Sequence, residues 1–147
     1  MGYSSEVYGY ISMSKDIFDD LMGKELDYNM SELLSVENGK LNFIDVPKKV
    51  MLKDYLPGLC YEDGKMKIRV EDESIDYGMN TDTLEGIFKS VSSKLDKDDM
   101  GCVEFRVEFF DEFFDEGSIW FYYWIGQDKV EYGEWGRPKD PDWFKEQ

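Results

Sequence analysis

Two stretches near the C-terminus have the residue pattern of long β-strands, and they limit the folds that the chain can adopt. From Val103 to Phe109, valine and phenylalanine alternate with charged residues, as expected when one strand face is buried. The second stretch, Ile119 to Ile125, is aromatic on both faces. We expect the two strands to pair. One aromatic face of the second strand could meet a partner, and packing under helices with cover by the C-terminal tail is the equal alternative.

Two other segments have the spacing of amphipathic helices, with apolar residues on one face. The first begins after Ser14, whose side-chain oxygen can cap it, and is expected to end at Gly23 or near Asp27. The second opens with Asp82 and Glu85, which resemble a capping box, and is expected to end near Lys97. The apolar positions of this second helix are Leu84, Ile87, Phe88, Val91 and Leu95.

Shorter signals complete the predicted sheet. An Asp-Gly pair at residues 63–64 favours a tight hairpin that joins residues 59–61 to residues 66–70. We expect further strands over residues 6–13 and 129–135. Strands joined by hairpins, with helices between them, predict an α+β fold: a mostly antiparallel sheet with two main helices packed on one face.

The middle of the chain is harder to assign. Residues 30–36 have the character of a short helix closed by Asn38 and Gly39, which often end helices in a left-handed conformation. An extended segment is expected over residues 41–46. Residues 48–56 suit a helix or a strand equally.

The length and composition predict one domain. A chain of 147 residues is expected to form a single acidic domain over residues 1–135, followed by an irregular tail over residues 136–147, pinned by Trp143 and Phe144. Two cysteines are too few for a disulfide framework, and no basic segment followed by an apolar run opens the chain. We therefore expect a cytoplasmic protein with both thiols reduced.

The charge of the chain limits its partners. Against 33 acidic residues there are 17 basic ones, a net charge of −16 that is spread over the whole sequence. Such a field repels phosphate backbones and anionic lipids, so we expect no direct binding to nucleic acid or to membranes. The same field attracts basic proteins. The alternative is that the acidity only provides solubility.

The residue types available argue against catalysis. The chain has no histidine, which excludes Ser-His-Asp and Cys-His nucleophiles and imidazole proton transfer. Asp96, Asp98 and Gly101 match part of a calcium-binding loop, but Met100 and Val107 occupy positions that require oxygen donors. No phosphate-binding glycine loop is present. We expect a protein that is not an enzyme and that needs no metal or cofactor.

One segment stands out as a candidate partner-binding surface. Between residues 104 and 116, six acids and one base, Arg106, are interleaved with five phenylalanines. Apolar anchors surrounded by carboxylates are typical of an interface with a basic protein. The alternative is that the phenylalanines belong to the core and the acids are only solvated. The candidate partner-binding residues are Glu104, Glu108, Asp111, Glu112, Asp115 and Glu116.

The opening residues carry a resemblance to a known group. Residues 1–7, MGYSSEV, resemble the start of small acidic proteins of tailed bacteriophages, where Met-Gly-Tyr, a variable residue, Ser, an acid and Val begin the first strand. Ser4 replaces the Arg often found there. The segment from Ile75 to Tyr77, the second helix and the strand from Val103 to Glu112 follow as in that group. The resemblance implies a phage origin and assigns no binding residues.

Three functions are consistent with these features. The leading hypothesis is a phage-encoded inhibitor of a host defence protein, a nuclease or guide complex, which covers a basic surface that binds nucleic acid. It would then act in the cytoplasm of the host cell. A bacterial immunity protein that neutralises a basic toxin is the alternative. A sponge for a charged signalling nucleotide is less favoured, because the basic residues are scattered.

Overall fold

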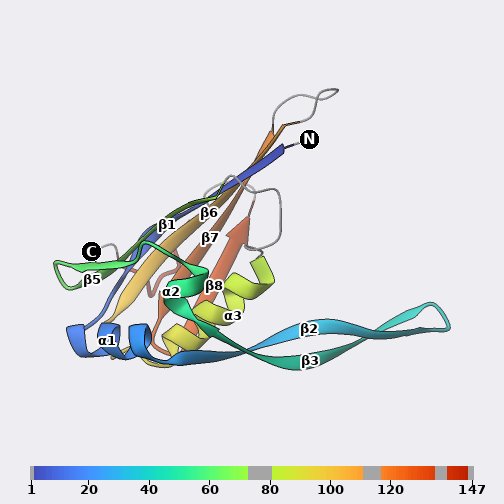
Figure 1. Ribbon diagram of the computed structural model, residues 1–147, viewed down its shortest axis with the longest axis horizontal. Coiled ribbons are helices and arrows are strands. Elements are labelled where there is room, and N and C mark those ends of the chain that lie inside the picture. Colours follow the sequence, from blue (N-terminus) through green and yellow to red (C-terminus); the bar gives the residue numbers. More distant parts are fainter. Residues whose placement is uncertain (1, 73–80, 111–116, 135–138, 146–147) are drawn as a thin grey trace.

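A six-stranded antiparallel sheet forms the body of the protein. The computed structural model describes residues 2–72, 81–110, 117–134 and 139–145, and Figure 1 shows how they are arranged. Within these residues, the strands follow one another across the sheet as neighbouring antiparallel pairs. In sheet order they are β4 (Cys60–Glu62), β5 (Lys65–Asp72), β1 (Gly2–Ser12), β6 (Met100–Phe110), β7 (Gly117–Gly126) and β8 (Lys129–Glu134).

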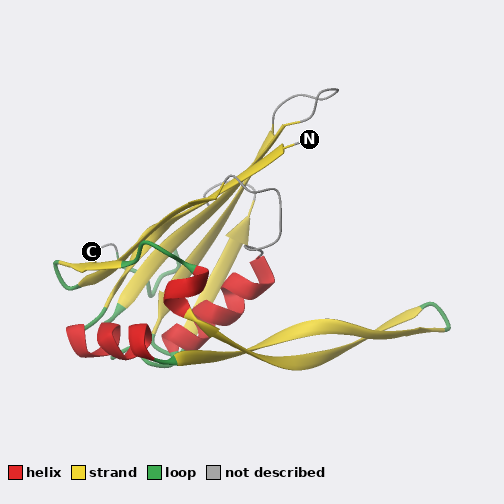
Figure 2. Cartoon of the chain, in the orientation of Figure 1, coloured by secondary structure: helices red, strands yellow, loops and turns green. Residues whose placement is uncertain are grey.

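The helices of the described chain all lie on one face of this sheet (Figure 2). They are α1 (Lys15–Gly23), α2 (Leu52–Tyr55) and α3 (Thr81–Ser92). Two of them are substantial, so the predicted α+β fold with a mostly antiparallel sheet and two main helices on one face is confirmed. Among the described residues, no helix combines the length and the apolar character needed to cross a bilayer.

The first part of the chain has a recognisable connectivity. Strand β5 lies between β4 and β1, and β6 pairs with the other side of β1. With α1 after β1 and α3 after β5, these elements follow the β-α-β-β-α-β order of a split β-α-β unit, with residues 25–55 inserted between α1 and β4. Strands β7 and β8 extend the sheet beyond β6. This arrangement describes the scaffold and does not by itself assign a function.

The main core lies between the sheet and the helices. Alternate residues of the strands point toward the helices, as the pattern of residues 103–109 predicts, with Val103 and Phe105 both buried. Helix α3 contributes its whole apolar stripe to this cluster, since Leu84, Ile87, Phe88 and Val91 are fully buried.

The other face of the sheet is partly covered by the tail. Tyr122 and Trp124 are buried there in a second cluster with Phe144. The indole Nε1 of Trp124 donates to Asp140 Oδ1 at 3.0 Å, and that of Trp143 donates to Glu131 Oε1 at 2.8 Å. Phe121 and Tyr123 face the main core. The aromatic strand is therefore packed on both faces, and Trp143 and Phe144 pin the described part of the tail as expected.

Several sequence-based boundaries are confirmed and others are wrong. The hairpin at residues 63–64 joins β4 to β5, and β6 pairs with β7, as predicted. Helix α1 ends at Gly23, one of the two predicted endpoints. Helix α3 ends at Ser92, earlier than the predicted end near Lys97, because the chain turns there and the Lys94 and Leu95 amides bond to carbonyls three residues back.

The prediction of a short helix at residues 30–36 is wrong. These residues lie in β2 (Glu25–Glu37), which pairs with β3 (Lys40–Met51) as a separate two-stranded hairpin, called the arm below. Asn38 and Gly39 do adopt positive φ angles, of 51° and 78°, but they form the hairpin turn and do not end a helix. Residues 48–56, left open between helix and strand, contain both the end of β3 and α2.

The arm projects from the body, and α3 holds its root (Figure 1). The ring of Tyr28 on β2 lies so close to Gly86 that a Cβ atom at residue 86 would be 2.8 Å from Tyr28 Cδ2. The Thr83 hydroxyl lies 3.4 Å from Met30 Sδ beside it. Glycine inside a helix costs about 1 kcal/mol relative to alanine. Here it allows the strand and the helix to approach each other.

This contact predicts opposite effects of one substitution in two backgrounds. Gly86→Ala is expected to lower the free energy of unfolding by about 1 kcal/mol in the wild type, because overpacking against Tyr28 outweighs the gain in helix propensity. In a Tyr28→Ala background, the same change is expected to raise stability by about 1 kcal/mol. Urea denaturation of the four proteins measures both values. An equal effect in the two backgrounds would show that the contact does not constrain residue 86.

Candidate functional site

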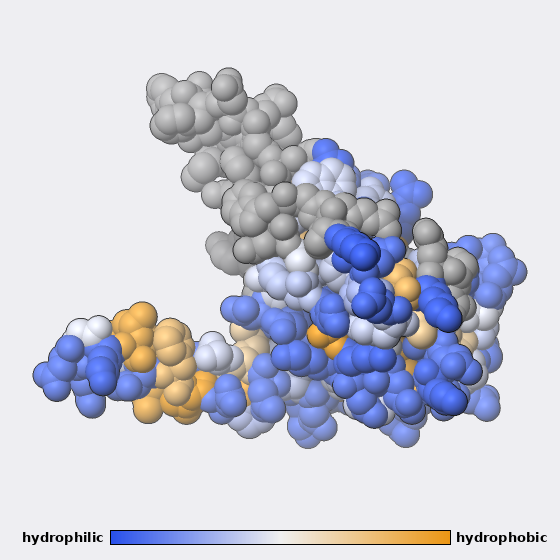
Figure 3. All heavy atoms as spheres, turned by 180° about the vertical axis from the view of Figure 1, so that it is seen from behind, coloured by the Kyte–Doolittle hydropathy of each residue, from blue (hydrophilic) through white to orange (hydrophobic). Residues whose placement is uncertain are grey.

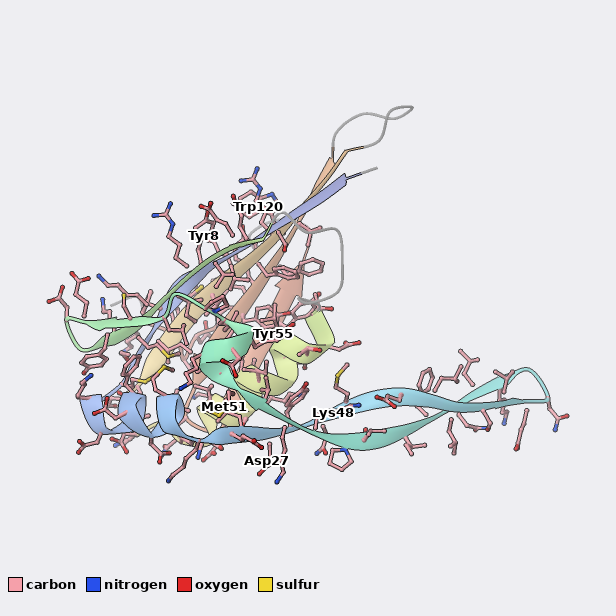
Figure 4. All side chains as sticks on the ribbon, in the orientation of Figure 1. Tyr8, Asp27, Lys48, Met51, Tyr55 and Trp120 are labelled. Atoms are coloured by element: carbon pink, nitrogen blue, oxygen red, sulfur yellow. The ribbon has the colours of Figure 1, made fainter. Side chains whose placement is uncertain are left out.

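A cleft lies between the root of the arm and helix α3, with a volume of about 500 Å³. Asp27 and Lys48 lie at this root (Figure 4). Strand β2 forms one wall of the cleft, Asp45 of β3 adds to that wall, and α3 forms the other wall. The lining residues are Asp27, Tyr28, Asn29, Met30, Ser31, Asp45, Asp82, Glu85, Gly86, Lys89 and Ser90.

The cleft is lined by carboxylates that have little neutralising charge. Asp27, Asp45 and Asp82 are exposed and form no ion pair with any residue that the structure describes. Glu85 is half-buried and pairs with Lys89, with 3.1 Å between Oε1 and Nζ. Lys89 is the single basic residue among the described lining residues. The lining of the cleft therefore has an excess of negative charge, although Lys48 and Lys49 of β3 lie across from Tyr28 and Asp27 at the arm root.

Two contacts hold α3, the helix wall of the cleft, in place. Tyr28 and Gly86 join the strand wall to the helix wall. The other contact holds the first turn of α3 to the sheet, where the hydroxyl of the buried Tyr123 on β7 donates to the backbone oxygen of Thr81 at 3.2 Å. The Phe88 ring also packs against the ring of Tyr123, with 5.2 Å between centroids. The cleft is thus built on a helix supported by the core.

The spacing of the carboxylates decides which cations they suit. Within the described ranges, no three acidic or cysteine side chains are grouped closely enough to hold a metal ion. Carboxylates spread along a cleft instead suit long basic side chains, because a guanidinium or ammonium group can donate to several of them. No disulfide joins Cys60 to Cys102. The lining of the cleft therefore suits arginine or lysine side chains better than a metal ion.

The sequence-predicted acidic run occupies another part of the molecule. Glu104 lies on β6 between the buried Val103 and Phe105, so it points to the sheet face opposite the helices, next to Tyr8 and Tyr122 in the register. Tyr8 and Trp120 mark that face in Figure 4. Glu108 is also in β6, where its backbone pairs with Ser4 of β1 and Ser118 of β7. Asp111, Glu112, Asp115 and Glu116 lie outside the described residues, as does the segment from Ile75 to Tyr77.

The acids of the cleft were not predicted from the sequence. Asp27, Asp45 and Asp82 are far apart along the chain, and only strand pairing and helix packing bring them together. The sequence does single out Asp82 and Glu85, but as a capping box at the start of a helix. Helix α3 begins at Thr81, one residue before Asp82, so Asp82 is not at the N-cap that a capping box requires. It lies in the first turn, where a carboxylate interacts favourably with the helix dipole.

Comparison with protein-family models, with curated proteins and with solved structures finds no match to this chain. The resemblance of residues 1–7 to small phage proteins therefore stays a prediction. Any function has to be argued from the geometry and charge of the described surface.

The buried Tyr123 predicts how stability depends on pH. Burial raises the pKa of Tyr123 above its ordinary value of 10.0, so the folded protein keeps this proton at a pH where the unfolded chain loses it. Its contribution to stability is complete below pH 10 and decreases above it, by about 1.4 kcal/mol per pH unit. Tyr123→Phe loses the hydrogen bond to Thr81, which costs about 1 kcal/mol at neutral pH, but has no such decrease.

We therefore expect the two proteins to become equally stable near pH 11, about one unit above the ordinary tyrosine pKa. Urea denaturation of both proteins between neutral pH and this value measures the difference. A difference that stays constant over the whole range would contradict the role given to Tyr123.

Proposed function

We propose that the protein is a non-catalytic binding protein whose acidic cleft receives arginine or lysine side chains of a basic partner protein. The observation that supports this proposal most directly is the group of three carboxylates, Asp27, Asp45 and Asp82, which line one cleft without an ion pair to a described residue. Carboxylates placed to meet cations form charge-assisted hydrogen bonds, which are about twice as strong as neutral ones.

The shape beside the cleft favours a partner with a concave surface. The arm projects from the body next to the cleft, so a groove that accepts the root of the arm would bring its basic rim to Asp27 and Asp45 (Figure 1). Basic grooves of this kind bind nucleic acid through lysine and arginine. Occupying such a groove would block nucleic-acid binding, and the net charge of −16 would speed the approach.

The partner class expected from the sequence is a nuclease or guide complex of a host defence system, and the protein would then act as its inhibitor. Affinity capture from a bacterial lysate, followed by mass spectrometry, identifies the partner. Competition with nucleic acid then tests the mode of binding: displacement by added nucleic acid supports occlusion of the groove. Recovery of a cognate toxin would instead assign the protein as an immunity protein.

The cleft predicts a specific loss of binding. Replacing Asp27, Asp45 and Asp82 by Asn is expected to weaken binding to the captured partner at least tenfold, because charged hydrogen bonds contribute about 1.5–3 kcal/mol each. Wild-type binding is expected to weaken strongly as salt rises, and the variant to depend less on salt. Isothermal titration at two ionic strengths measures both effects.

The matched control removes the same charge elsewhere. Asp16, Asp63 and Asp98 are exposed and lie outside the cleft, so their replacement by Asn is expected to change the affinity little. Equal losses in the two triple variants would mean that only net charge matters, which contradicts a role for the cleft.

The acidic run provides a second comparison. Replacing Asp111, Glu112, Asp115 and Glu116 by Asn and Gln tests whether the run predicted from the sequence also binds. If this variant loses affinity while the cleft variant binds like the wild type, the partner surface is the run and the proposal for the cleft is wrong.

A further inference from the structure

The outer end of the arm exposes a set of large apolar side chains that the cleft does not use. We call residues 33–44 the arm tip. Five of its side chains are 54–66% exposed, and Figure 3 shows them gathered on the projecting arm. They are Leu33, Leu34, Val36, Leu41 and Phe43. A two-stranded hairpin is only marginally stable alone in water, so an apolar surface at its far end is expected to be covered by a partner.

The strand register sorts four of these side chains onto one face of the ribbon. Leu33 pairs with Phe43, and Val36 pairs with Leu41, because the register shifts by one residue between Leu33 and Ser35. Phe43 and Leu41 are two residues apart on β3, so they point to the same side, and their cross-strand neighbours do as well. Two adjacent apolar pairs thus form one flat face.

The arm tip carries no net charge, although the chain as a whole carries −16. Its only charged residues are Glu37 and Lys40, which pair across the turn. At about 3.3 Å per residue, Val36 lies about 30 Å along the strand from Asp27 at the arm root. This distance exceeds the Debye length of about 8 Å at physiological salt several-fold. The charge of the body is therefore screened at the tip.

We propose that the apolar face of the arm tip binds the same face of a second copy of this chain. A two-fold axis between the two apolar pairs places the Leu33–Phe43 pair of each copy over the Val36–Leu41 pair of the other. The ribbons then stack face to face, about 10 Å apart, and run in opposite directions. The two acidic bodies lie at opposite ends of the stack. Asp45 is on the same face as Phe43, two residues away on β3, so it lies at the edge of the apolar contact, beside the turn of the other copy.

The charge of the arm tip favours a second copy of the chain over two other partners, a basic protein and a lipid bilayer. A basic protein would gain no ionic contact from a neutral tip, so the charge complementarity that favours it at the cleft does not extend here. A bilayer with anionic lipids would repel the acidic body, and the tip has only Lys40 to meet a phosphate headgroup. A second copy of the same face needs no opposite charge.

Sedimentation velocity over a concentration series tests the proposal on the purified chain. Because the contact is small, we expect a monomer–dimer equilibrium in the micromolar to millimolar range. Higher salt is expected to change the dimer little, because the charge of the body is already screened at the tip, whereas it weakens binding of a basic partner at the cleft. The outcome is therefore independent of the proposed function. A chain that stays monomeric at about 1 mM in high salt would overturn the proposal.

Two single variants test the stacking register. Phe43→Lys and Leu41→Glu are each expected to weaken the dimer at least tenfold, and an equimolar mixture is expected to recover it, because residue 43 of one copy faces residue 41 of the other. Recovery also shows that both variants are folded. If the single variants are monomeric and their mixture stays monomeric, the stack is wrong.

A matched control lies on the opposite face of the same strand. Ile44 is 40% exposed and pairs with Glu32, so Ile44→Ser removes an apolar side chain of the arm outside the stacked face. This variant is expected to dimerise like the wild type. A loss equal to that of Phe43→Lys, or binding of the monomer to neutral lipid vesicles through the tip, would assign the tip to another occupant.

Discussion

The packing of helix α3 between the sheet and the arm is the contact on which the rest of the structure depends. One side of the helix is buried on the sheet, where Phe88 meets Tyr123. Another side meets Tyr28 through Gly86 and so fixes the root of the arm. Without this helix, only the first residues of the arm would be held, by Leu26 in the main core and Val50 packed against it. The rest would depend on cross-strand hydrogen bonds, which rarely stabilise a two-stranded ribbon in water. The cleft would also lose one of its walls.

The structure separates two kinds of surface that are mixed in the sequence. The acids lie mainly on the body, where their mutual repulsion is offset by a core that includes fully buried residues from every helix. The exposed aliphatic residues gather at the arm tip, which has no net charge. A body with a charge of −16 repels its copies at close range. A neutral tip held far from that body is the place where an apolar contact meets the least repulsion.

Much of the fold could be predicted from the sequence, because strands with one buried face and helices with one buried stripe have a local periodicity. Residues 103–109 and 84–91 show this clearly. The arm could not be predicted in this way. Met30, Leu33 and Leu34 have helical spacing, and the residues that they pair with lie on β3, across the turn. The Asn-Gly pair at 38–39 serves a helix end and a hairpin equally well. The lining of the cleft comes from two strands of the arm and from α3, so no local sequence pattern could predict which acids line it.

The two proposals, taken together, explain why the arm is long. A short hairpin would place the apolar face within reach of the acidic body, where approach of a second copy would bring carboxylates together. In the proposed stacked dimer, the two clefts would lie at opposite ends of the paired arms, each beside its own α3. If both proposals hold, such a dimer would bind two basic partners, or two sites of one symmetric partner, and the second contact would form at a raised effective concentration. Weak pairing at the tip then increases the strength of binding at the cleft.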